Sequence, residues 1–102
     1  MNITVEQPVS VFIRALENSM QAKTLRVLEL LEEYGHQLGM PHSRALKGGL
    51  FELRIRGKQE VRLLYGYHSK KAIIVHAFIK KTQQTPAKEL AYALKRLHSY
   101  YT

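Results

Sequence analysis

The stretch FELRIRGKQEVRLLYGYH, residues 51–68, decides the fold, because apolar and polar residues alternate on both sides of a short polar turn. Alternation with a period of two is typical of a β-strand with one face in a core. Pairing across a four-residue loop would put Arg62 on the apolar face of the first strand, whereas an odd loop or a bulge would unite the apolar residues of both strands. We predict the second register, which gathers Arg54, Arg56 and Arg62 on the opposite face.

The segments that flank this hairpin predict the other elements. The run AIIVHAFI, residues 72–79, is apolar on both faces, as expected of a central strand. Residues 2–5 form a possible short strand, and the glycine-punctuated residues 35–49 predict an irregular loop. Apolar residues at helical spacing predict three helices. These helices cover residues 8–18, 20–35 and 87–101.

The ends of these helices carry capping and breaking residues. Pro8 suits a first helical turn, and Ser19 is placed to cap the second helix, which we expect to stop at Gly35. Thr85 and Pro86 are expected to form the cap and first turn of the last helix. The two amino-terminal helices are therefore expected to be antiparallel neighbours.

Together these patterns predict an α+β fold. It consists of a small, mainly antiparallel sheet, two amino-terminal helices on one face and a carboxy-terminal helix. The register of the hairpin places the helices on the apolar side of the sheet and an arginine-lined surface on the other side. A chain of 102 residues with 45% hydrophobic content fits one domain, which spans residues 1–102.

The basic charge of the chain is confined to its second half. Up to Ser43 there are three Lys and Arg against five Glu, a net charge of −2, whereas from Arg44 onward there are thirteen against three, a net charge of +10. A one-sided excess of this kind is typical of a protein that binds a polyanion such as RNA. A surface that serves only solubility is the alternative.

Several classes of protein are disfavoured by the composition. The chain has no cysteine, so neither a disulfide framework nor a cysteine zinc site holds it together. The five histidines lack the spacing of metal ligands, so we expect no metal site and no cofactor. No leader pattern opens the chain, and its longest apolar run is too short to cross a bilayer. We therefore expect a soluble cytoplasmic protein that does not contact membranes.

Four motifs in this order resemble a known family. They are LFELRIR, VRLLY, HAFIKKTQQTP and ALKRL, which lie between residues 50 and 97. Together with two preceding helices they resemble the RelE/ParE toxin superfamily, specifically its phage-derived HigB-like branch of type II toxin-antitoxin systems. The resemblance covers roughly the whole chain and is most specific from Gly49 to Pro86.

The resemblance implies an activity and partners. It implies a RelE-like fold and an endoribonuclease that cleaves mRNA without a metal, commonly on the ribosome, and so inhibits translation. The ribose 2′-hydroxyl attacks the adjacent phosphate, which requires a base, cations for the extra charge on phosphorus and an acid for the leaving 5′-oxygen. A helix-turn-helix antitoxin, HigA-like, is the implied protein partner.

The resemblance also implies site residues, because positions in the motifs of the family match basic residues of this chain. Arg54 matches a basic residue on the strand before the turn, and Arg62 matches the arginine after it. The resemblance implies that both are catalytic residues, which bind the phosphate and stabilise the transition state. Lys80 and Lys81 match the basic pair that closes the last strand. A lysine is charged at neutral pH, so it acts as a base only where burial or neighbouring cations lower its pKa.

The sequence leaves the general base open. Other members of the superfamily carry tyrosine, histidine or aspartate after the basic pair, whereas this chain has TQQTPAKE there. His76 is a candidate, because it shares a strand face with Lys80. Further candidates for contact with the RNA backbone are Lys47, Arg56, Lys58 and Lys71.

Two other functions fit the same chain. The ParE branch of the superfamily inhibits DNA gyrase without cleaving RNA, and a basic RNA-binding module would need no catalytic residues. The retained arginines and the lysine pair favour a nuclease over a gyrase inhibitor. A simple RNA-binding module leaves the match at FIKKTQQTP unexplained.

Overall fold

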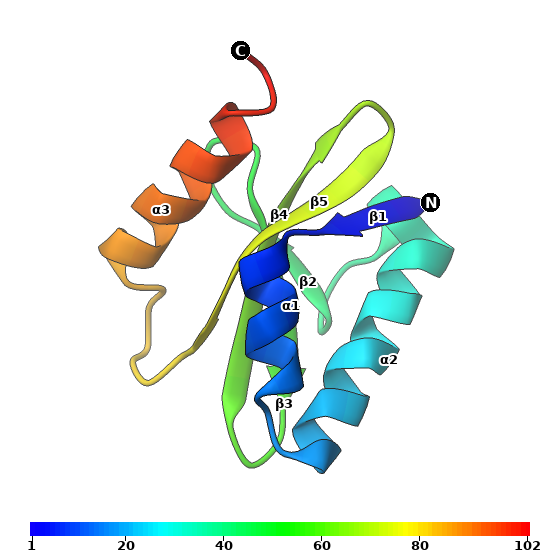
Figure 1. The fold of residues 1–102 in the computed structure, drawn as a ribbon, viewed down its shortest axis with the longest axis vertical. Helices are drawn as coiled ribbons and strands as arrows, with labels where there is room; N and C mark the ends of the chain where they lie inside the picture. The colour runs from blue at the N-terminus through cyan, green and yellow to red at the C-terminus, as the bar shows by residue number, and fades with distance from the viewer.

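The computed structural model describes all residues, 1–102, as a five-stranded sheet covered by helices on both faces (Figure 1). The strands lie in the order β1-β5-β4-β3-β2. They are β1 (Asn2–Val5), β2 (Ser43–Ala45), β3 (Phe51–Arg56), β4 (Glu60–His68) and β5 (Lys71–Ile79). The helices are α1 (Gln7–Arg14), α2 (Asn18–Tyr34) and α3 (Ala87–His98), with a 3-10 turn at Gly35–Gln37. This arrangement confirms the predicted α+β fold.

The hairpin of β3 and β4 adopts the register predicted from its alternation. Ile55 lies opposite Val61, and Arg54 lies opposite Arg62. Arg56 pairs with Glu60, so the loop is residues 57–59, an odd length. The apolar side chains of both strands therefore share one face, and the arginines share the other.

Strand β5 lies inside the sheet between β1 and β4, which fits the predicted strand with two apolar faces, and it contains an irregularity. It pairs in parallel with β1 and antiparallel with β4. Leu64 lies opposite His76 but the next residue, Tyr65, lies opposite Ile74, so Val75 is an extra residue on β5. Such a bulge reverses which side chains face which side. The segment that follows, ending at Lys80, is therefore turned so that Lys80 shares the arginine face.

The core has two parts, one on each face of the sheet. The larger part, of 14 buried residues, includes Leu28 and Leu31 of α2 and lies between the sheet and both amino-terminal helices. The smaller part, of 7 buried residues, includes Ala93 and Leu97 of α3. The expectation that one side of the sheet is free of helices was therefore wrong. The α3 helix packs on the arginine face, because Leu64, Ile73, Val75 and Phe78 make part of that face apolar.

Three local predictions also require correction. Ser19 lies inside α2, where its hydroxyl donates to Glu17, and no side chain caps that helix. Thr85 does not cap α3 either, because its hydroxyl donates to the carboxylate of Glu52 instead. The predicted loop 35–49 contains the 3-10 turn and β2, which pairs antiparallel with the start of β3. None of the helices has the length and apolarity needed to span a membrane.

A partly buried ion pair joins the two ends of the chain. The guanidinium of Arg96 donates to both oxygens of Glu6, at 3.1 and 2.6 Å, and the hydroxyl of Tyr100 donates to the same carboxylate at 2.5 Å. Burial raises the pKa of Glu6. The hydrogen bonds from Arg96 and Tyr100 and the charge of Arg96 together outweigh this effect, so the pKa of Glu6 lies below its ordinary value. This contact joins the start of α1 to α3.

Replacing Glu6 with Gln should make stability less dependent on pH. A carboxyl group with a lowered pKa in the folded state stabilises the protein above its unfolded pKa, and the stabilisation is lost as pH falls through the folded pKa. The difference in unfolding free energy between wild type and Glu6→Gln should therefore be present at pH 7 and should shrink progressively below the ordinary pKa of 4.5. Urea titrations at several pH values measure it. A difference that grew toward acid pH would contradict this assignment.

Truncating Leu97 should destabilise the protein strongly. Its side chain is 2% exposed and lies in the smaller core under α3, so Leu97→Ala should lower the unfolding free energy by about 2–5 kcal/mol. Leu25→Ala is the matched control, because Leu25 is 51% exposed and its truncation should change stability by no more than about 0.5 kcal/mol. Chemical denaturation followed by circular dichroism checks both, and similar losses would show that α3 is not anchored through Leu97.

Candidate functional site

A hollow of about 500 Å³ opens where β3, β4 and the segment after β5 meet, and we call it the basic hollow. Five basic side chains and a single carboxylate line it, together with two polar residues. The lining residues are Arg54, Arg56, Glu60, Arg62, Lys80, Lys81, Thr82 and Gln83. Cations distant in sequence therefore meet at one place. The pairing of Arg54 with Arg62, and of the Lys80 N–H with the Glu60 carbonyl at 2.7 Å, sets their positions.

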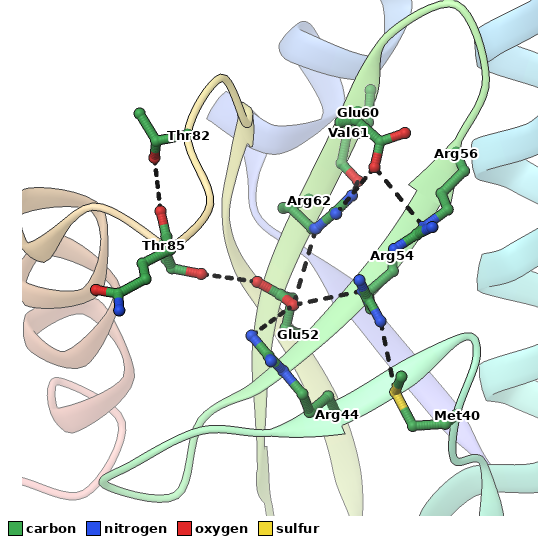
Figure 2. A network of polar contacts seen from close by, with 11 residues as sticks. Met40, Arg44, Glu52, Arg54, Arg56, Glu60, Val61, Arg62, Thr82 and Thr85 are labelled. Carbon is green, nitrogen blue, oxygen red and sulfur yellow. Dashed lines mark hydrogen bonds and ion pairs between the residues drawn. The ribbon is translucent and has the colours of Figure 1, made fainter.

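The carboxylate of Glu52 is completely buried. It lies among the guanidinium groups of Arg44, Arg54 and Arg62 (Figure 2). Its Oε1 lies 3.4 Å from Nη2 of Arg44, 3.9 Å from Nε of Arg54 and 3.8 Å from Nε of Arg62. These are ion pairs without direct hydrogen bonds, because Oε1 and both Nε atoms lack a hydrogen-bond partner. The negative charge therefore offsets the repulsion between the paired arginines without neutralising all of them.

Arg62 forms the floor of the hollow and is itself held by the protein. Its side chain is 2% exposed, Nη2 donates to Oε1 of Glu60 at 3.0 Å, and Nη1 donates to the Val61 carbonyl at 3.1 Å. Arg54 is more accessible, and its Nη1 lies 3.6 Å from the sulfur of Met40. Arg62 thus contributes positive charge from a buried position, whereas Arg54 is partly accessible from the hollow.

The segment after β5 is fastened over the sheet by a threonine. The hydroxyl of Thr85 donates to Oε2 of Glu52 at 2.9 Å, and the hydroxyl of Thr82 donates to the Gln84 carbonyl at 2.7 Å (Figure 2). These two bonds bend the chain between the last strand and α3. Lys81, Thr82 and Gln83 consequently lie at the rim of the basic hollow.

The environment of Lys80 alters its acidity. Desolvation by burial is the largest effect and lowers the pKa of the ammonium group. The charge of Glu52 opposes this shift, while the charges of Arg62, Arg44 and Arg54 reinforce it, and the net pKa of Lys80 lies below its ordinary value. A lysine with a lowered pKa can exchange a proton with a ligand near neutral pH more readily than an ordinary lysine. Burial and the neighbouring arginines lower the pKa of Arg54 in the same way.

His76 shares the face of Lys80 but does not reach the hollow. Its Nε2 lies 2.7 Å from Oε1 of Glu89, in the first turn of α3, and its ring lies against Phe78 and Tyr92. The candidate general base is thus held at the interface between the sheet and α3. The reason is that α3 packs on this face of the sheet, whereas the sequence pattern predicted helices only on the other face.

Three of the four proposed RNA-backbone residues do not line the hollow. Lys71 begins β5, roughly 30 Å from Lys80 along a strand that rises about 3.3 Å per residue. Lys47 lies in the turn between β2 and β3, which is also at the far end of the sheet. Lys58 lies in the hairpin loop, and its ammonium group pairs with Glu17 at 3.2 Å. Of the four proposed RNA-backbone residues, only Arg56 lines the basic hollow.

Several residues of the site were not predicted from the sequence. These are Arg44, Glu52, Glu60, Thr82, Gln83 and Thr85. A signal for Glu52 was present, because the alternation of residues 51–56 puts it on the arginine face, where a lone carboxylate among cations is expected to pair. No group of three or more His, Cys, Asp or Glu side chains is arranged to hold a metal ion.

Removing the charge of Glu52 should destabilise the protein more than removing an exposed carboxylate. Glu52→Gln leaves buried Arg62 without one of its counter-ions, and breaking a buried ion pair typically lowers the unfolding free energy by about 3–5 kcal/mol. Glu29→Gln is the matched control, because its pair with Arg26 is exposed and is worth at most about 1 kcal/mol. Urea denaturation compares them, and equal effects would mean that Glu52 does not hold the arginine cluster.

Comparisons with known proteins identify the family of this chain. A search of curated proteins gave no match. The family described as Phage derived protein Gp49-like (DUF891) matches residues 11–98. The matched segment runs from within α1 to the end of α3 and includes every residue that lines the basic hollow. The chain therefore belongs to the phage-derived Gp49-like family.

Proposed function

We propose that the protein is the toxin of a type II toxin-antitoxin system, of the HigB-like branch of the RelE/ParE superfamily, and that it is an endoribonuclease acting on mRNA. The observation that carries this proposal is the convergence of five basic side chains from β3, β4 and the segment after β5 in one hollow. A site built to stabilise charge on phosphorus needs such a cluster of cations. Membership of a phage-derived family is consistent with a mobile toxin gene.

The reaction requires no group other than RNA and side chains. A base removes the proton of the 2′-hydroxyl, the O2′–P bond forms, and the P–O5′ bond breaks as the 5′-oxygen gains a proton. The products are a 2′,3′-cyclic phosphate and a 5′-hydroxyl end. Between these states the phosphorus carries additional negative charge, which cations held in place before the reaction stabilise.

Lys80 is the residue we assign to proton transfer. It is half-buried in the hollow, and burial and the arginines lower its pKa, which favours the neutral form that must accept the 2′-hydroxyl proton. Lys81 is exposed at the rim, where it is placed to protonate or stabilise the leaving 5′-oxygen. Arg54 and Arg56 bind the phosphate oxygens. Arg62 acts from the floor, through charge and by fixing the position of Glu60.

The proposed partners follow from this chemistry. A hollow lined by five cations has a positive potential that attracts the RNA backbone and increases the association rate at low salt. Free toxin of this kind must be neutralised, and a helix-turn-helix, HigA-like antitoxin is the partner that we propose. The ribosome is the proposed place of cleavage, because it presents mRNA as a single strand.

The test is to induce the protein in cells and map the 5′ ends of mRNA. Wild type should arrest growth and create new 5′-hydroxyl ends within coding regions. Lys80→Ala and Lys81→Ala should each reduce their appearance by a hundredfold or more, the order of magnitude lost when one transition-state donor is removed. Lys88→Ala is the matched control, because Lys88 is an exposed lysine of α3 that does not line the hollow, and it should cleave like wild type.

The same experiment separates the alternatives. Growth arrest with intact transcripts and accumulating gyrase-linked DNA breaks would replace the nuclease by a gyrase inhibitor. Cleavage that persists in both lysine variants would overturn the assignment of the site. Circular dichroism of each purified variant establishes that a loss of cleavage is not a loss of fold.

A further inference from the structure

A second hollow, of about 460 Å³, lies between α2 and the end of β3, and we call it the α2–β3 groove. It adjoins the basic hollow, because Arg54 and Arg56 line both. Its remaining lining comes from one side of α2, from β3 and from the segment before β2. These residues are Ala22, Lys23, Arg26, Val27, Pro41, His42 and Ile55.

The walls of the groove are fastened to one another. The carbonyl of His42 accepts a hydrogen bond from the Arg54 N–H at 2.8 Å, which fixes the segment before β2 against β3. On the other side, the ammonium group of Lys23 donates to the Arg56 carbonyl at 3.3 Å. The groove is therefore part of the folded structure and not a gap between loosely packed elements. Ala22 lies exposed in its wall, so the opening is not filled by a side chain.

The chemistry of the groove differs from that of the basic hollow. Its inner surface includes the buried side chains of Val27 and Ile55, whereas the basic hollow has no hydrophobic lining residue. Cations and the imidazole of His42 surround this apolar surface. Unstacked bases of single-stranded RNA are bound in this way, with their faces against apolar, imidazole or guanidinium groups and their phosphates near cations.

We propose that the α2–β3 groove is a nucleobase subsite, which holds an unstacked base of the RNA strand whose phosphate lies in the basic hollow. This inference rests on the proposed function. The shared arginines favour a nucleic acid over an acidic protein segment, because one strand of alternating bases and phosphates matches an apolar groove continuous with a cationic hollow. The groove thereby contributes to which nucleotide is accepted beside the scissile bond.

The test uses a fluorescent single-stranded ten-nucleotide RNA in which fluorine replaces each 2′-hydroxyl, so that the nucleophile is absent. Abasic sites are introduced one position at a time, and binding to the full-length protein is measured by fluorescence anisotropy. For wild type, loss of the base at one internal position should weaken binding about fivefold or more, as expected for one stacked base. Loss at other positions should have smaller effects.

Ala22→Glu places a carboxylate in the groove and should abolish the sensitivity to that one position as well as weaken binding of the intact strand. Leu25→Glu is the matched control, because it adds the same charge to an exposed position of α2 that does not line the groove. It should keep the abasic profile of wild type. Circular dichroism confirms that both variants fold.

Other results would overturn the subsite. If the two variants have equal abasic profiles, the groove holds no base of the RNA. If wild type is sensitive to no abasic position while Ala22→Glu still weakens binding, the groove contacts only the RNA backbone. Displacement of the strand by a glutamate-rich peptide from wild type but not from Ala22→Glu, with no base sensitivity, would assign the groove to a protein partner. mRNA cleavage in cells that persists under either result leaves the proposed function intact, whereas wild type that neither binds nor cleaves RNA refutes both.

Discussion

The burial of the Glu52 carboxylate among arginines is the interaction on which the site depends. Arg54 and Arg62 lie directly opposite each other on neighbouring strands, an arrangement that is unfavourable without a counter-ion. Glu52 supplies that counter-ion for both and, through Thr85, also holds the segment that carries the lysine pair. Burying charges requires desolvation, so a cluster of this kind adds little to stability compared with apolar packing. Its effect is to hold several cations in one geometry before a ligand arrives.

A single extra residue in β5 determines which side of the sheet the last cation joins. Without the irregularity at Val75, the alternation of side chains would place Ile79 on the face of Arg62 and turn Lys80 to the other face. With the bulge, the apolar residues before it and Phe78 after it cover the same face, and Lys80 follows them. Because of the bulge, one face of β5 carries both the apolar residues that pack against α3 and, at its end, the basic residue Lys80.

The sequence predicts those parts of the structure that depend on local periodicity. Alternation predicted the register of the hairpin and the arginine face, and the apolar run predicted that residues 72–79 form a strand inside the sheet. The side on which α3 packs could not be predicted, because its apolar stripe fits either face of the sheet. For the same reason His76 looked available. The separation of Lys71 from Lys80 could have been predicted, because the strand expected at residues 72–79 lies between them. Burial of Arg62 depends on Glu52, a contact between strands that spacing suggests but does not establish.

The placement of α3 also limits how much of the arginine face is open to the RNA that we propose as ligand. The helix covers the apolar half of the arginine face through Ala93 and Leu97, and the basic hollow opens only beyond it. Within the hollow the cations divide into a buried one, Arg62, and exposed ones at the rim such as Lys81. A buried cation loses little side-chain freedom when a ligand binds, because folding has already fixed it. In the proposed function, the exposed cations make the direct contacts with the phosphate, and the buried cation adds a positive charge that is already fixed in position.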